Sequence, residues 1–150
     1  VGCYSLTSDG EFMPWTACKT IPDALEFVNA VDLPSSAILF DTLHYDRCGS
    51  TPDDIAKIPA DKMNYIQLCD GPADYDRSDS ELIRIARTAR LFPGAGGIDF
   101  GSFLHLMPPD ITVSVEVPDK PLAEKMGRAE FAREALARTK SLLDRILPPI

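Results

Sequence analysis

The chain has 150 residues, the length of one domain with a sizeable core, and its 45% hydrophobic and 25% charged residues are ordinary for a soluble globular protein. The formal net charge of −8 argues against nucleic acid and against an anionic membrane surface, because either partner requires a basic patch. No apolar run approaches the roughly 20 residues of a membrane span.

The first residues carry no signal peptide and no initiator Met, so we expect a cytoplasmic protein that is a fragment or a processed product. The four cysteines include no Cys-x-x-Cys pair, which makes a zinc knuckle or a thioredoxin motif unexpected. We interpret them as reduced thiols rather than as a disulfide framework.

Helix starts are the clearest local signals along the chain. Caps followed by prolines or acidic residues predict helices over 20–31, from 51, and over 78–89. Asp99 can cap a short helix reaching about residue 107, and an apolar stripe predicts a last helix over about 127–147.

Strands are expected between these helices, at about 37–42, 63–69 and 111–117, with a first strand somewhere within 2–13. The three later runs are apolar on both faces, as parallel strands buried under helices are. The repeated strand–helix order predicts an α/β fold with a parallel sheet in a single domain over 1–150. Four βα units are half of a (β/α)8 barrel. The glycine-rich segment 91–97 matches no nucleotide-binding pattern, which favours a plain loop over a phosphate cradle.

Four acidic or amide side chains each stand in or just after one of these strands: Glu11, Asp41, Gln67 and Glu116. Parallel barrels and sheets build metal sites in this way, with oxygen ligands at the carboxyl ends of successive strands. Taken alone, such a carboxylate is more often a helix cap or a solvated loop residue, and Gln67 can equally bond to a neighbouring backbone. The ordered set therefore carries the hypothesis of a metal site.

Five segments of the chain, in this order, resemble the sugar phosphate isomerase/epimerase family of xylose isomerase-like TIM barrels over about residues 11–147. The segments are 11–16, 41–44, 65–70, 91–99 and 113–118. The resemblance implies that the chain is the C-terminal half, with four βα units, of a TIM (β/α)8 barrel. Two residues depart from the family pattern: Gln67 replaces the more usual His, and Ala95 stands where relatives often carry Glu. The approach to Glu11 also departs, because residues 6–10 indicate a turn where the family has an apolar strand.

The resemblance further implies that one divalent metal is held by Glu11, Asp41, Gln67 and Glu116. With an amide in place of His, the ligand set is all oxygen, which favours Mg²⁺ or Mn²⁺ over Zn²⁺. Glu11 and Glu116 would pass a proton to and from the α-carbon of the substrate. His44 matches a family histidine that orients the substrate, and Trp15 is expected to line the pocket.

The implied function is a metal-dependent sugar or sugar phosphate isomerase or epimerase, which transfers a proton on a polyhydroxylated carbonyl substrate. A dehydratase of the inosose or 3-dehydroshikimate type would use the same residues. The alternative outside enzymes is a truncated half-barrel without activity. Arg77, Arg87 and Arg90 are candidates for binding a phosphate or carboxylate of the substrate, although Arg87 and Arg90 are also typical of a solvated helix end.

Four βα units leave two open sheet edges with unpaired backbone groups. We also expect the inward faces of the strands to lack a second half to pack against, since they would carry Ile38, Phe40, Ile66, Leu68, Val113 and Val115. Apart from a small sugar-like substrate, the expected partner is therefore a second copy of the chain, or a missing N-terminal half that completes the barrel.

Overall fold

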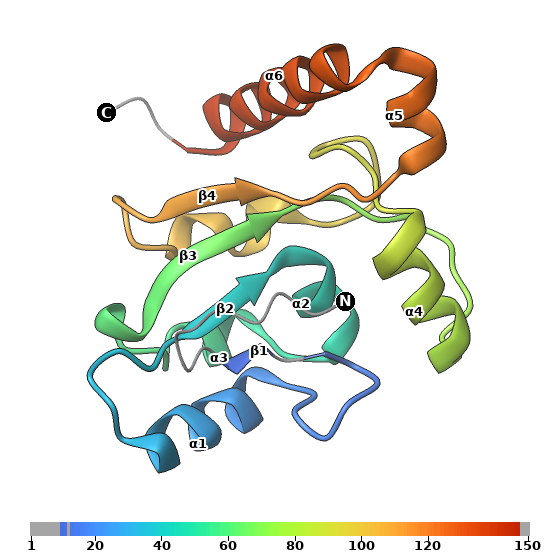
Figure 1. Ribbon diagram of the computed structural model, residues 1–150. Helices are drawn as coiled ribbons and strands as arrows, with labels where there is room; N and C mark the ends of the chain where they lie inside the picture. Colours follow the sequence, from blue (N-terminus) through green and yellow to red (C-terminus); the bar gives the residue numbers. More distant parts are fainter. Residues whose placement is uncertain (1–9, 12, 148–150) are drawn as a thin grey trace.

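The computed structural model describes residues 10–11 and 13–147 of the chain. Its centre is a sheet of four parallel strands in the order β1-β2-β3-β4, so each strand lies beside the next one in sequence (Figure 1). The strands are β1 (Gly10–Glu11), β2 (Ile38–Asp41), β3 (Met63–Leu68) and β4 (Thr112–Val115). All four predicted strands are confirmed, and the arrangement is half of a TIM barrel.

Within residues 10–11 and 13–147, six α-helices and three short 3-10 segments connect and follow the strands. The helices are α1 (Ile21–Val31), α2 (Thr42–Cys48), α3 (Pro52–Ile55), α4 (Asp79–Thr88), α5 (Lys120–Met126) and α6 (Arg128–Ile146), and the 3-10 segments are η1 (Ala60–Lys62), η2 (Phe100–Ser102) and η3 (Leu104–Leu106). The predicted starts of α1 and α3 are confirmed as capping boxes, in which Thr20 pairs with Asp23 and Thr51 with Asp54. The sequence reading missed α2 and α5.

The expected orientation of the apolar strand residues is wrong. Ile38, Phe40, Ile66 and Leu68 belong to the buried core, and Val113 packs against it. The ring of Phe40 lies 5.2 Å from that of Tyr45 in α2 and 5.9 Å from that of Phe103, which lies between η2 and η3. These strand residues therefore face the covering helices. Because side chains alternate along a strand, the opposite face carries Asp41, Gln67 and Ser114.

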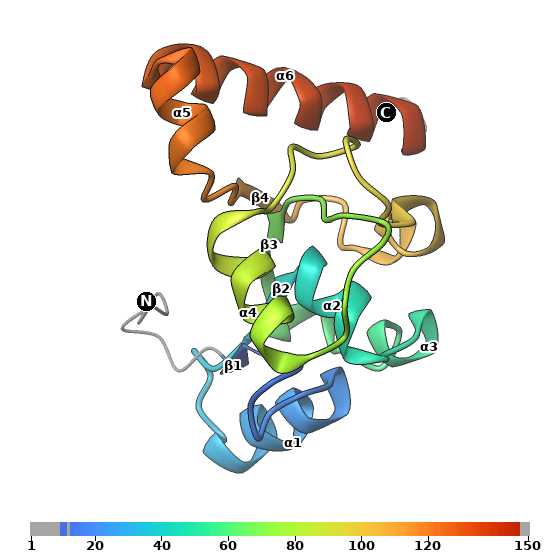
Figure 2. The same ribbon diagram turned by 90° about the vertical axis from the view of Figure 1, so that its right-hand side faces the viewer.

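The helix α4 lies beyond the carboxyl ends of the strands rather than over the sheet (Figures 1 and 2). After α4 the chain forms a backbone bridge between Leu91 and Asp70, which lies just past the end of β3. The short segments η2 and η3 then pack on the sheet and lead into β4, with Phe100, Phe103 and Leu104 in the core. As a result, the end of α4 delivers residues to the edge where the predicted site residues lie.

No helix in the described part of the chain is long and apolar enough to cross a membrane. Cys18, Cys48 and Cys69 are free thiols, as expected. Cys3 lies outside the described residues.

Candidate functional site

Asp41 ends β2 and is completely buried. Its Oδ1 atom accepts hydrogen bonds from the backbone amides of Leu43 (2.8 Å) and His44 (3.0 Å), so the carboxylate caps α2. Its Oδ2 atom accepts a hydrogen bond from Nη1 of Arg90 at 2.5 Å. Asp41 thus caps α2 through Oδ1 and pairs with the guanidinium group of Arg90 through Oδ2.

Arg90 is the centre of the cluster and is only 4% exposed. Its Nη1 atom lies 2.5 Å from Oδ2 of Asp41 and 3.2 Å from Oε2 of Glu116, and it also contacts the Cys69 thiol at 3.4 Å. Its Nε atom donates to the carbonyl of Ala86 at 2.8 Å. Burial by itself would lower the pKa of Arg90, but the charge of Asp41, the thiolate that Cys69 forms at high pH and the charge of Glu116 outweigh burial and raise that pKa above its usual range. Arg90 therefore carries a permanent positive charge at the end of the sheet.

Of the two readings left open for Arg90, the solvated helix end is wrong, because the side chain is buried and paired with Asp41 and Glu116. The signal was present in the spacing of α4. Leu82, Ala86 and Arg90 follow one another at intervals of four, so Arg90, two residues after the end of α4, continues the buried side of that helix. A charged residue on the apolar stripe of a helix predicts a buried ion pair.

Gln67 and Ser114 lie level with Asp41 across the sheet. Asp41 pairs in register with Gln67, and Gln67 pairs with Ser114. Glu116 follows β4, and its backbone amide donates to the carbonyl of Leu68, which extends the ladder by one step. The structure therefore brings Asp41, Gln67 and Glu116 to one edge, as predicted from their places in the sequence.

The first predicted ligand, Glu11, stands in β1, where its backbone pairs in register with Leu39. Leu39 precedes Asp41 by two residues. The backbone of Glu11 therefore lies two residues nearer the amino end of the sheet than Asp41 does. Its side chain and the approach at residues 6–9 lie outside what the structure describes.

The two predicted substrate-binding residues contact each other. The ring of Trp15, in the loop between β1 and α1, meets the ring of His44 edge-on at 5.1 Å and 80°. His44 is 2% exposed, and burial lowers its pKa, with Asp41 opposing this effect and Arg90 adding to it. A lowered pKa keeps His44 neutral at pH 7.

Cys69 is the other titratable group in contact with the cluster. It is completely buried, and burial, together with the charge of Asp41, raises the pKa of its thiol to about 12. Cys69 therefore stays protonated at neutral pH, which excludes it as a thiolate nucleophile.

The residues at the carboxyl edge of the sheet could bind a metal ion through oxygen atoms. Within 10–11 and 13–147, no three His, Cys, Asp or Glu residues are grouped closely enough to hold an ion. However, Oδ2 of Asp41 and Oε2 of Glu116 converge on a single positively charged atom, and the Gln67 amide lies in the adjacent strand. Two carboxylates and an amide fit a hard divalent cation, with Glu11 as the further donor that the resemblance implies. In this structure Nη1 of Arg90 lies between the carboxylates of Asp41 and Glu116.

The glycine-rich loop is a plain connection, as predicted. Its amides at Gly96 and Ile98 donate to the buried carboxylate of Asp70, at 2.8 and 3.1 Å. A Cβ atom at Gly96 would lie 2.1 Å from the carbonyl oxygen of Gly71, so only glycine fits there. Because Asp70 already uses these amides, the loop does not offer them to a phosphate.

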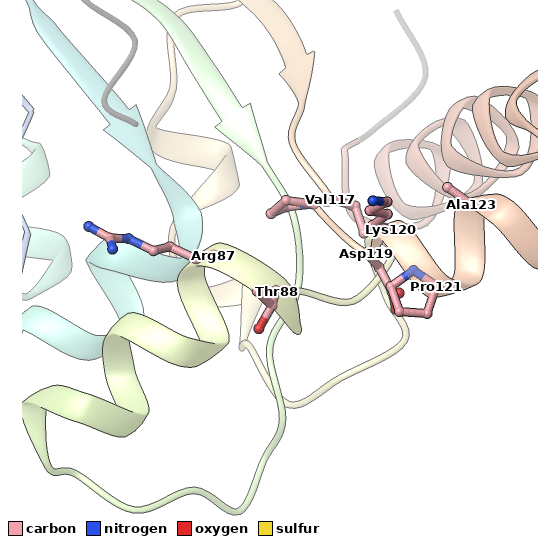
Figure 3. A pocket seen from close by; sticks show the side chains of 8 residues that line it. Arg87, Thr88, Val117, Asp119, Lys120, Pro121 and Ala123 are labelled. Atoms are coloured by element: carbon pink, nitrogen blue, oxygen red, sulfur yellow. The ribbon is translucent and has the colours of Figure 1, made fainter.

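A cavity of about 470 Å³ opens between the end of α4 and the segment that follows β4. Arg87 and Thr88 at the end of α4 line one side, and residues 117–121 and 123 after β4 line the other (Figure 3). The exposed cations Arg87 and Lys120 and the acidic Asp119 are among its lining residues. Asp41, Gln67, Arg90 and Glu116 do not line it.

Comparisons with known proteins identify relatives of this arrangement. A family model described as xylose isomerase-like TIM barrel matches residues 10–142. Two proteins named 3-dehydroshikimate dehydratase, from Pseudomonas aeruginosa and Pseudomonas putida, are each 28% identical over 86 residues, which is 57% of this chain and 13% of the relative.

Solved structures with the same fold include the IolI protein with a bound zinc atom, with a TM-score of 0.74 and 23% identity over 93% of this chain and 49% of that one. The probable 3-dehydroshikimate dehydratase AsbF from Bacillus anthracis has a TM-score of 0.61 and 17% identity, over 90% of this chain and 48% of that one. The chain thus spans about half the length of these structures and a smaller share of the curated relatives.

Proposed function

The chain belongs to the xylose isomerase-like TIM barrel family, and we propose that it forms the C-terminal half of a divalent-metal-dependent isomerase or epimerase. The reaction would be the transfer of a proton at the carbon next to a carbonyl group of a polyhydroxylated substrate. The observation that carries the proposal is the convergence of Asp41 and Glu116 on one positively charged atom at the carboxyl end of the sheet.

The proposed metal ligands are Glu11, Asp41, Gln67 and Glu116. Their oxygen atoms favour Mg²⁺ or Mn²⁺, although the related IolI structure contains zinc. When bound, the metal would polarise the hydroxyl and carbonyl oxygens of the substrate and stabilise the negative charge that forms on proton removal.

Glu116 is the best-placed proton acceptor among the described residues. Its side chain is 44% exposed, so a substrate can reach it, whereas Asp41 is completely buried. His44 and Cys69 are buried as well, and the thiol of Cys69 remains protonated. Glu11 is the proposed second proton carrier, on the basis of its place in the family pattern, and Trp15 and His44 are the proposed wall of the substrate site.

The substrate would bind on the exposed side of Glu116. Arg87 and Lys120, which line the cavity after β4 together with Asp119, are the proposed partners for a phosphate or carboxylate group of the substrate. Sugar phosphates and 3-dehydroshikimate both carry such a group.

A dehydratase is the second candidate, favoured by the two relatives named 3-dehydroshikimate dehydratase. The same base would remove the proton, and loss of the β-hydroxyl group would then replace the return of the proton. Which of the two follows depends on the substrate bound rather than on the residues of this edge.

One assay distinguishes these activities. The protein at its full natural length is loaded with Mn²⁺ and incubated in D₂O with ketose phosphates and, separately, with 3-dehydroshikimate. Isomerase or epimerase activity would place deuterium on the α-carbon, detected by NMR, whereas dehydration of 3-dehydroshikimate yields an aromatic acid with a new ultraviolet absorption. If none of these substrates gains deuterium or gives an aromatic product at saturating Mn²⁺, the proposal is wrong.

We also propose that a second half-barrel closes the sheet. β1 and β4 are the outer strands, and in the described residues each pairs on one side only. An open parallel edge favours pairing with another strand. Sedimentation equilibrium on the 150-residue chain should give a dimer or larger species, and a stable, cooperatively folded monomer would show that the edges need no partner.

A further inference from the structure

A single nitrogen atom, Nη1 of Arg90, holds both carboxylates of the proposed metal site. It lies 2.5 Å from Oδ2 of Asp41 and 3.2 Å from Oε2 of Glu116. The other oxygen of Asp41 already accepts two backbone amides, so Oδ2 is the atom that this residue has left for a cation.

Arg90 is anchored in this position. Its guanidinium group is almost completely buried, and its Nε atom donates to the carbonyl of Ala86 one turn earlier. The contact with the Cys69 thiol closes a third side. Such a group is a fixed internal cation rather than a mobile surface side chain.

We propose that Arg90 is a resident counter-ion that competes with the divalent metal for Asp41 and Glu116, so that metal binding requires Arg90 to release both carboxylates. The proposal rests on the metal site proposed above. It adds that the affinity of this site for metal is set by a residue that is not a ligand.

The geometry makes the two cations mutually exclusive. A metal ion binds carboxylate oxygens at about 2.0–2.6 Å, which is the space that Nη1 occupies next to Oδ2 of Asp41. Two cations at this distance also repel each other strongly in a buried, poorly solvated place. Because Glu116 is half-exposed, the guanidinium group of Arg90 can move away from the two carboxylates on the side where Glu116 lies. The exchange keeps buried Asp41 neutralised in both states.

The test is a calorimetric titration with Mn²⁺ of the full-length protein and of its Arg90→Gln variant. Removal of the competing hydrogen-bonded cation should strengthen Mn²⁺ binding by about tenfold to a hundredfold. A merely structural role for Arg90 predicts the opposite, because a damaged site binds metal more weakly. Arg84→Gln is the matched control, since Arg84 is an exposed arginine in α4, the helix that precedes Arg90, and pairs with Glu81. This control should bind Mn²⁺ like the parent.

Thermal unfolding provides a second readout. In EDTA, Arg90→Gln should unfold at a lower temperature than the parent. Addition of Mn²⁺ should raise the unfolding temperature of the variant more than that of the parent. A variant that folds only with Mn²⁺ also supports the proposal. If Arg90→Gln does not fold at all, Arg90→Lys decides, because a single ammonium group is a poorer bridge between two carboxylates and should also bind Mn²⁺ more tightly than the parent does. Equal or weaker binding by the folded variant overturns the competition while leaving the metal site in place. Absence of Mn²⁺ binding in parent and variant alike overturns both.

Discussion

Replacing Glu116 by Gln is expected to reduce proton exchange at the substrate α-carbon by about 10²–10⁴-fold, the usual contribution of a general base. The amide preserves the shape of the side chain but cannot accept the proton. Because the Glu116 side chain is 44% exposed and its hydrogen bond to Leu68 comes from the backbone, the substitution should leave the fold intact.

Deuterium incorporation from D₂O into the substrate, followed by NMR at saturating Mn²⁺, measures this loss. Glu130→Gln is the matched control, because Glu130 is an exposed glutamate of α6 that pairs with Arg133 away from the site. It should exchange at the parent rate. Parental exchange in Glu116→Gln would exclude Glu116 as the base and leave Glu11 as the remaining carboxylate candidate.

Replacing Asp41 by Ala in the metal-free protein is expected to lower the free energy of unfolding by about 4 kcal/mol. Roughly 3 kcal/mol comes from leaving the buried Arg90 with only the half-exposed Glu116 as counter-charge, and about 1 kcal/mol from losing the cap of α2. Asp41→Asn keeps an oxygen for the cap amides, so it should lose only about 3 kcal/mol.

Urea unfolding in EDTA measures both variants. If the loss arises from the stranded charge, Asp41→Ala combined with Arg90→Met should recover much of the stability, and the double-mutant cycle isolates the pair. A loss below about 1 kcal/mol in Asp41→Ala would mean that the Asp41–Arg90 pair contributes little to the fold.

Local signals in the sequence were sufficient for most of the fold. The cap at Thr20 and the proline after Thr51 placed α1 and α3, because side-chain capping acts within a few residues. The helix α2 escaped because it has only seven residues and starts directly at the end of β2, with Asp41 serving as both strand end and cap. α5 escaped because its seven residues include none that is buried, so it has no apolar stripe of its own, and the predicted stripe begins only at about residue 127.

The candidate site was predictable only in part. Asp41, Gln67 and Glu116 could be placed together because the ends of parallel strands converge. The face of the apolar residues was assigned wrongly, since strands that are apolar on both sides do not reveal which side the helices cover. The position of Arg90 depends on α4 folding over the strand ends and on a long-range pair with Asp41, which lies 49 residues earlier. The spacing of Leu82, Ala86 and Arg90 indicates a buried position for Arg90, but it does not identify Asp41 as the partner.

The most direct test of the metal site is a calorimetric titration of the full-length protein with Mn²⁺, compared with its Asp41→Ala and Asp23→Ala variants. Asp23 is the matched control, because it is also a capping carboxylate but belongs to α1, where it accepts from the amides of Lys19 and Thr20. The account predicts about one Mn²⁺ per barrel in the parent and in Asp23→Ala, and no measurable binding in Asp41→Ala. An unchanged titration in Asp41→Ala would contradict it.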